Sequence, residues 1–228
     1  MLRLRQAVLV ARDLDGVVAE LRAQLPLGEP FHDAGVGHFG LRNAVMALGD
    51  TFVEVVSPVA DGTAAGRRLD RLGADAGGYM AMFQVDDIDA ARERVARLGV
   101  RVVFEIELED VVDLHLHPRD VPGAIVALDR MRPPESWRWG GPAWEAKAPP
   151  ALGPGRITGA TLTADDPEAL AQRWASVLGA PRDGTTIPLD GGELRFTPGE
   201  RDAIAAFHVE GVDTDAVIGG VRFEGAPA

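Results

Sequence analysis

Glu54 is the residue in this chain whose type and surroundings point most directly to chemistry. It lies in the segment Phe52-Val-Glu-Val-Val56, where its neighbours are all apolar. A carboxyl group in such a strand either has a polar partner or has its pKa raised by burial, which brings it into the range useful for proton transfer. We expect Glu54 to be a catalytic acid or base. The alternative is a structural ion pair with an arginine such as Arg42.

A second group of titratable side chains comes later in the chain. His115 and His117 are two residues apart in a strand-like segment, so both side chains point to the same face of a sheet. Imidazole binds metals and carries protons near neutral pH. We therefore take His117 as a second catalytic candidate. The alternative is that one histidine packs or caps near the Pro118 turn while the other is solvated.

The composition limits the classes of partner. The chain has 228 residues, of which 46% are hydrophobic, and 35 acidic against 23 basic residues give a net charge of −12. This charge argues against nucleic acid or an anionic membrane as a partner and favours a small-molecule ligand. There is no cysteine, which excludes disulfide and thiolate chemistry. No apolar run approaches the roughly 18 residues of a membrane span, and we expect a cytoplasmic protein.

A repeated unit must position these candidates. Three segments run from an apolar strand into an acidic helix cap, at 7–15, 81–89 and 160–168. An amphipathic stripe follows each cap and ends at proline or glycine, which predicts three helices. A fourth copy, 205–213, matches the second and then stops short. Repeats of this size indicate the architecture more strongly than any local feature does.

Strand-like segments follow each predicted helix, so the unit is β-α-β-β-β. They cover 29–34, 41–47, 52–56, 102–108, 113–117, 124–128, 185–189 and 193–196. We expect residues 1–130 to pair two units, 131–154 to form a Pro/Trp-rich connecting segment, and 155–228 to hold a degenerate third unit with the truncated fourth copy. The tryptophans of the connecting segment are expected to dock on a domain surface.

The repeated unit, with a strand leading into Asp-Leu-Asp at 7–15 and endings such as 48–58 and 116–126, resembles the vicinal oxygen chelate superfamily. That superfamily includes glyoxalase I, methylmalonyl-CoA epimerase, extradiol dioxygenases and the bleomycin-resistance binders. The resemblance implies an α+β fold, in which βαβββ modules pair into a curved, half-open barrel sheet with helices outside. Because lone half-barrels leave strand edges unpaired, we expect a monomer with internal module pairing or a homodimer.

The resemblance also implies a divalent metal held at four positions, one on the first and one on the last strand of each module. Here these positions are Gln6, Glu54, Met80 and Ala127. A thioether is a poor ligand for a hard ion and an alanine methyl is none, so half of the usual site is missing. A rearranged metal site would combine Gln6, Glu54, His115 and His117. Otherwise we expect no tightly bound metal.

Two functional classes remain open. One is a lyase or isomerase of the glyoxalase or epimerase type, which uses Glu54 and His117 on a small oxygenated molecule. The other is a metal-free binding protein of the resistance or sequestration type. In both cases the ligand-binding residues are expected to be Gln6, His38, Asn43, Met80, His115 and Ala127. A purely structural member with a filled cavity is a third alternative.

Overall fold

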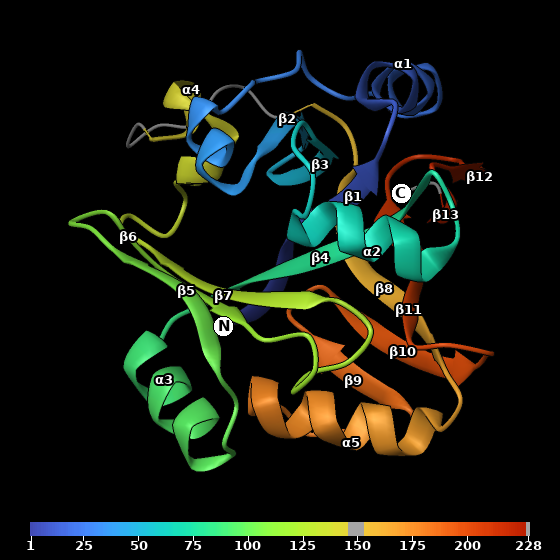
Figure 1. Ribbon diagram of the computed structural model, residues 1–228. Coiled ribbons are helices and arrows are strands. Elements are labelled where there is room, and N and C mark those ends of the chain that lie inside the picture. The colour runs from blue at the N-terminus through green and yellow to red at the C-terminus, as the bar shows by residue number, and fades with distance from the viewer. Residues whose placement is uncertain (146–152, 227–228) are drawn as a thin grey trace.

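The strands of the protein form two sheets that draw on successive parts of the chain (Figure 1). The computed structural model describes residues 1–145 and 153–226. The first sheet has the order β2-β3-β1-β4-β7-β6-β5. Its strands are β1 (Leu2–Ala11), β2 (Leu41–Leu48), β3 (Thr51–Pro58), β4 (Ala76–Val85), β5 (Val102–Glu107), β6 (Val111–Leu116) and β7 (Ile125–Met131). The second sheet has the order β12-β13-β11-β8-β10-β9. Its strands are β8 (Arg156–Ala164), β9 (Thr186–Leu189), β10 (Gly192–Pro198), β11 (Ala203–Glu210), β12 (Asp215–Ile218) and β13 (Val221–Ala226).

The three predicted helices are confirmed, and each begins at its acidic cap. The side chains of Asp13, Asp87 and Asp166 each accept a hydrogen bond from a backbone N–H in the first turn, at 3.0, 2.9 and 3.0 Å. These caps start α1 (Leu14–Gln24), α3 (Ile88–Arg97) and α5 (Pro167–Leu178). The other helical elements are α2 (Ala64–Leu72), α4 (Pro142–Glu145), and the 3-10 turns η1 (Ala34–Phe39) and η2 (Arg138–Gly140). None of the helices in the described ranges is long and apolar enough to cross a membrane.

Each sheet is built from two copies of the repeated unit. In the first sheet, β1 and β4 lie antiparallel at the centre, and β3 and β7 run parallel to them on either side. In the second sheet, β8 and β11 lie at the centre, flanked by β10 and β13 in the same way. These two curved, unclosed sheets confirm the α+β fold of paired modules. The division of the chain near residues 130 and 155 remains a proposal, although the strands of the two sheets separate there.

One expected strand is not formed. The segment 29–34 contributes only an isolated bridge, in which Phe31 pairs with Val45. Pro30 lies inside this segment and has no N–H to donate to a ladder, which interrupts pairing at this edge. The prediction of a strand here was therefore wrong.

Two irregularities in the central β1–β4 pairing change where side chains point. The register shifts between Leu4 and Gln6 on β1 and again where β4 passes through Tyr79. A bulge adds one residue to a strand and re-aims its side chain. As a result Tyr79 and Met80, although adjacent in sequence, both belong to the same buried apolar cluster.

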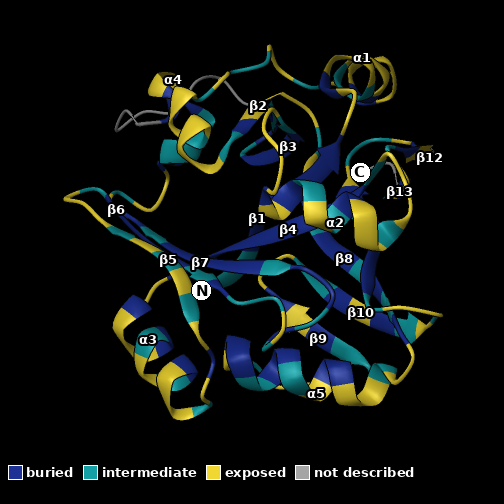
Figure 2. Ribbon diagram, in the orientation of Figure 1, coloured by how far each residue is buried: buried dark blue, intermediate teal, exposed yellow. Residues whose placement is uncertain are grey.

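Buried side chains form two clusters on opposite faces of the first sheet. One cluster includes Leu9 and Phe83 of the first sheet together with Phe207 of the second, so it joins the two sheets. The other includes Val8 and Met82 and is closed by the connecting segment through Trp137 and Trp144, which are 0% and 5% exposed. Figure 2 shows the strands buried at the centre and the exposed sides of the helices facing outward.

Candidate functional site

Glu54 lies at the centre of a polar network on the face of β3 that the connecting segment covers. Its side chain is only 7% exposed. Its Oε2 accepts a hydrogen bond from Nε2 of Gln6 at 2.7 Å, and its Oε1 accepts one from Nδ2 of Asn43 at 2.7 Å. Both carboxyl oxygens are therefore acceptors, an arrangement that suits the ionised form. The alternative ion pair is absent, because Arg42 pairs with Asp15 at 3.2 Å.

The two amides that hold Glu54 are themselves fixed in orientation. Nε1 of Trp137 donates to Oε1 of Gln6 at 2.6 Å, and the backbone N–H of Asp33 donates to Oδ1 of Asn43 at 2.9 Å. Each amide oxygen is thus already engaged, so each amide nitrogen must face Glu54. The network is connected from the loop at Asp33 through to the connecting segment.

The electrostatic surroundings of Glu54 prepare it for proton transfer. Burial raises its pKa, and the hydrogen bonds from Asn43 and Gln6 act against that rise. The negative charge of Asp33 raises the pKa further, while His115 lowers it. A carboxyl group with a raised pKa and a fixed orientation can act as a base or an acid near neutral pH.

His115 on β6 and His117, which follows that strand, lie in separate surroundings. His115 lies with Nε2 at 2.8 Å from Oδ2 of Asp113, and its ring packs against Phe104 with centroids 5.0 Å apart. His117 follows the end of β6, where its Nδ1 accepts a hydrogen bond from the backbone N–H of Arg119 at 3.0 Å. His117 therefore caps the turn at Pro118. The structure does not bring both histidines to Gln6 and Glu54.

The four positions at which the superfamily holds a metal do not fit one here. Gln6 turns its amide nitrogen toward Glu54 and its amide oxygen toward Trp137, so no lone pair of Gln6 faces the same side as Glu54. Met80 and Ala127 are buried and provide no hard ligand. In residues 1–145 and 153–226, no three His, Cys, Asp or Glu side chains form a group that could hold a metal ion. The groups around Glu54 suit a hydrogen-bonded carboxyl group and do not suit a metal ion.

The remaining predicted ligand-binding residues lie in different surroundings. Met80 and Ala127 belong to the apolar cluster next to the network, and Ala127 is opposite His115 in the strand register. His38 lies in η1, is exposed, and makes an edge contact with Phe39 at 5.4 Å between ring centroids. The structure therefore does not place His38 in the network around Glu54.

A buried pair of aspartates was not predicted. Asp113 and Asp129 face each other in the register of β6 and β7 and are 2% and 0% exposed. Nε1 of Trp139 donates to Oδ1 of Asp129 at 2.7 Å, while Asp113 Oδ1 and Asp129 Oδ2 have no hydrogen-bond partner among the described residues. Burial, and then the charge of Asp113, raise the pKa of Asp129 well above its ordinary value. Because side chains alternate between the two faces of a strand, Asp113 lies on the same face of β6 as His115.

Comparison with known proteins agrees with this fold. The sequence matches the family described as "Glyoxalase-like domain" over residues 7–178. The ethylmalonyl-CoA/methylmalonyl-CoA epimerase of Cereibacter sphaeroides is 29% identical over 140 residues, which cover 57% of this chain and 98% of that protein.

Two solved structures are similar over different lengths. A hypothetical protein from Staphylococcus aureus aligns over 100% of both chains, with a TM-score of 0.70 and 13% identity. A variant of the methylmalonyl-CoA epimerase of Streptomyces coelicolor, in complex with 2-nitronate-propionyl-CoA, aligns over 59% of this chain and 98% of that chain, with a TM-score of 0.50 and 24% identity. These likenesses concern the fold. With the family match, they confirm the resemblance to the vicinal oxygen chelate superfamily, and the chain belongs to the glyoxalase-like domain family.

Proposed function

We propose that the chain is an isomerase-type enzyme in which Glu54 moves a proton on a small oxygenated molecule, with no divalent metal at the four superfamily positions. The observation that carries this proposal is the way Glu54 is held. Two amide donors bind both of its oxygens, and each amide is fixed by a further donor. A carboxyl group that only stabilised the fold would be expected to pair with a cation instead.

The network also supplies a group for the charge that develops on the ligand. When Glu54 takes up a proton, one of its oxygens becomes a donor and a weaker acceptor for its amide. The N–H of Gln6 or Asn43 can then donate to the ligand oxygen that becomes negative. Fixed donors of this kind are effective in a buried site because they need no reorganisation.

The relatives suggest the first substrate class to test. Their names refer to epimerases of ethylmalonyl-CoA and methylmalonyl-CoA, and epimerisation removes a proton from a carbon next to a carbonyl and returns it. Glu54 is suited to that step. We propose a carbonyl compound with such an acidic C–H as the substrate of this chain.

The experiment is deuterium exchange in D₂O, with methylmalonyl-CoA as the first compound and mass spectrometry as the readout. The wild type is expected to exchange the proton next to the carbonyl faster than the uncatalysed background. Glu54→Gln is expected to reduce the enzyme-dependent rate by about 10²- to 10⁴-fold, since it keeps the shape and removes the base. The control is Glu20→Gln, a change on the exposed side of α1. Equal rates in the wild type and Glu54→Gln would contradict the proposal.

A second candidate function is metal-free binding. Met80 and Ala127 turn two polar superfamily positions apolar, which favours an apolar ligand. In that case the same assay would show no exchange, and ligand affinity would be equal in the wild type and Glu54→Gln.

A further inference from the structure

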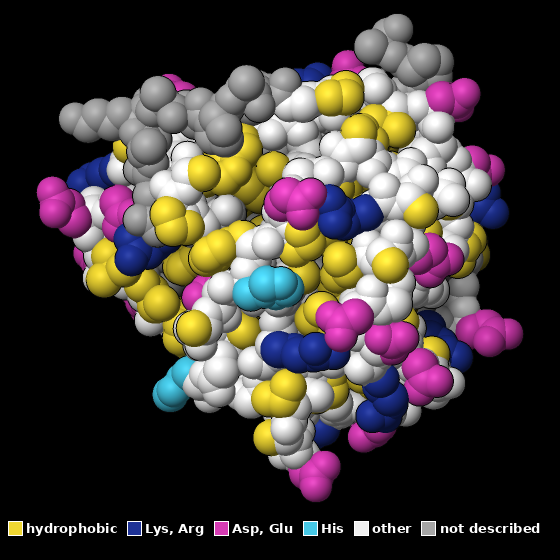
Figure 3. All heavy atoms as spheres, turned by 90° about the horizontal axis from the view of Figure 1, so that it is seen from above, with side chains coloured by type: hydrophobic (Ala, Val, Ile, Leu, Met, Phe, Trp, Pro, Cys, Tyr) yellow, Lys and Arg dark blue, Asp and Glu magenta, His cyan; other side chains and the backbone are white. Residues whose placement is uncertain are grey.

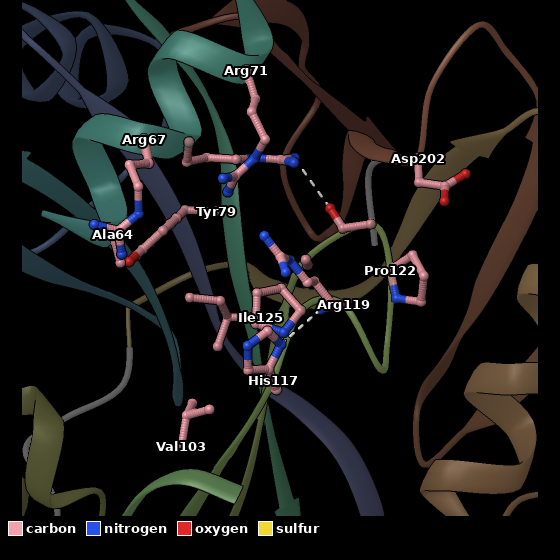
Figure 4. Close-up of a pocket in the computed structure, with 14 residues that line it drawn as sticks. Ala64, Arg67, Arg71, Tyr79, Val103, His117, Arg119, Pro122, Ile125 and Asp202 are labelled. Carbon is pink, nitrogen blue, oxygen red and sulfur yellow. Dashed lines mark hydrogen bonds between the residues drawn. The ribbon is translucent and has the colours of Figure 1, made fainter. Parts of the chain in front are cut away.

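A cavity of about 690 Å³ opens between α2, the loop after β6 and the start of β11 (Figure 4). Its volume lies in the usual range for small-molecule sites. Glu54 and its amide partners do not line it. The close-up shows Arg67 and Arg71 reaching in from α2, with His117 and Arg119 on the loop below them. Two separate segments that connect strands of the first sheet, α2 and the loop after β6, therefore form walls of the cavity.

The cavity is lined by four arginines and a single acidic side chain. The arginines are Arg67, Arg68, Arg71 and Arg119, and the acid is Asp202. The ion pairs found in the described part of the chain involve other arginines, such as Arg12 with Asp70 and Arg101 with Asp120. In a chain with a net charge of −12, this is a local concentration of positive charge that the ion pairs of residues 1–145 and 153–226 do not neutralise.

Arg68 differs from the other three because it is half-buried and two backbone carbonyls hold it. Its Nε donates to the oxygen of Gly78 and its Nη2 to the oxygen of Gly123, both at 3.1 Å. These bonds satisfy N–H groups and leave the charge in place. Burial lowers the pKa of Arg68, and the charge of Arg71 lowers it further. Arg68 therefore holds the wall of the cavity in place. A negatively charged group beside it would relieve the repulsion between Arg68 and Arg71.

Arg67, Arg71 and Arg119 are exposed and have donors to spare. Among the described contacts, Arg67 donates to the backbone oxygen of Gly62, close to the start of α2. His117 adds a further donor, because its Nδ1 accepts from the backbone and the proton of the neutral ring must therefore be on Nε2. The planar guanidinium fork matches carboxylate and phosphate oxygens.

Asp202 does not cancel this charge. It is one carboxyl group against four guanidinium groups, and it lies on the far side of the cavity from α2 in Figure 4. Figure 3, which views the molecule from above, shows a histidine on the upper face with hydrophobic, basic and acidic side chains around it.

Tyr79 connects the cavity to the network around Glu54. It lines the cavity, and the bulge in β4 turns it toward the same apolar cluster as Met80. Burial raises the pKa of Tyr79 to about 12, and the charge of Glu54 raises it as well. A ligand held at its charged end by the arginines could extend past Tyr79 toward Glu54; this last point rests on the proposed function.

We propose that this cavity is a binding site for a compact group with two or more negative charges, a phosphate or a polycarboxylate, held by Arg67, Arg71 and Arg119 with His117. Arg68 positions the walls. Phosphates and polycarboxylates share this chemistry, and inorganic pyrophosphate and citrate are the probes that distinguish them.

The test is isothermal titration of the full chain with pyrophosphate and, separately, with citrate. The variant combines Arg67→Gln, Arg71→Gln and Arg119→Gln, which leaves the bracing Arg68 in place. The matched control removes the same charge elsewhere through Arg22→Gln, Arg42→Gln and Arg222→Gln. Circular dichroism and thermal unfolding establish that both triple variants are folded.

Pyrophosphate, citrate or both are expected to bind the wild type, and the probe that binds identifies the phosphate or the carboxylate source. Loss of one charged hydrogen bond weakens binding by about tenfold, so the cavity variant is expected to lose at least that much affinity while the control changes little. The titration measures binding alone and needs no proton transfer by Glu54, so a failure of the proposed function leaves this result intact. The proposal would be overturned if neither pyrophosphate nor citrate bound the wild type, or if the two triple variants were weakened equally.

Discussion

The indole N–H of Trp137 donates to Oε1 of Gln6 across 131 positions of the sequence, and this bond fixes the amide that holds Glu54. Trp137 also stacks with Phe52, at 6.0 Å between ring centroids, and lies under the guanidinium of Arg5 at 5.3 Å. The connecting segment thus forms one wall of the candidate site.

Replacing this indole tests the role of its hydrogen bond. Trp137→Phe leaves an aromatic ring but removes the donor, so the buried oxygen of Gln6 loses its partner. We expect the free energy of unfolding to fall by about 1–3 kcal/mol more than for Trp144→Phe. Trp144 is the control because it is also buried in this cluster and no hydrogen bond from its Nε1 is found in the described contacts. Chemical denaturation measures both, and equal losses would show that only packing matters.

The buried aspartate pair predicts a dependence of stability on pH. Because the pKa of Asp129 is raised in the folded state, that state binds more protons than the unfolded chain above the ordinary aspartate pKa of 3.8. Stability is therefore lost as the pH rises from that value through the raised pKa.

Asp129→Asn is expected to remove this loss of stability at higher pH. Its side-chain oxygen still accepts from Trp139, and its nitrogen supplies a donor between the two facing side chains. We expect the variant to match the wild type near pH 4 and to be more stable by on the order of 1 kcal/mol near pH 8. Thermal unfolding across this range measures the difference, with the exposed Asp61→Asn as the control. An unchanged pH slope would show that Asp129 is ionised in the folded protein.

The missing metal ligands predict the effect of restoring them. Met80→His together with Ala127→Glu returns nitrogen and oxygen donors to the two apolar positions beside Glu54. We expect this double variant to bind about one Co²⁺ per chain, detected by its visible absorption, while Met80→His alone binds far more weakly. Stoichiometric Co²⁺ in the wild type that disappears in Glu54→Gln would contradict the inference that the wild-type residues do not fit a metal.

The packing of the two sheets predicts a sensitive glycine. A Cβ added at Gly78 would lie 2.6 Å from Cβ of Ile204 on β11, which is too close for the backbones to stay in place. Gly78→Ala is expected to destabilise the protein by about 1–3 kcal/mol. At Gly37 no atom lies within 4 Å of an added Cβ, and Gly37→Ala should change stability by less than about 1 kcal/mol. Similar values for the two variants in urea unfolding would argue against this close contact.

The repeated caps and stripes were enough to predict three helices and most strands, because each signal is local and occurs again in the next copy. α2 was missed because it lies between two copies and belongs to neither. Its own signals were present, with Thr63 as the N-cap and Gly73 at the C-terminal end. Three of the four arginines of the cavity, Arg67, Arg68 and Arg71, lie on this helix, so the cavity was missed with it.

The candidate site could be predicted only in part. Gln6, Asn43 and Glu54 were each chosen from the sequence, but which of them are in contact depends on the register of β1, β2 and β3. The partner of Gln6 is Trp137, which the sequence placed on a surface without naming its contact. A joint metal site was one interpretation of the histidines, and a cap near the Pro118 turn was the other; the turn after β6 gives His117 the role of that cap.

The most direct test of the central claim is proton exchange by protein freed of metal. After chelator treatment and dialysis, the deuterium exchange of methylmalonyl-CoA is compared in the wild type with and without added Co²⁺, and in Glu54→Gln. The exchange is expected to survive chelation, to be unchanged by added metal, and to be lost in Glu54→Gln. Exchange that is lost on chelation and restored by Co²⁺ would contradict this expectation.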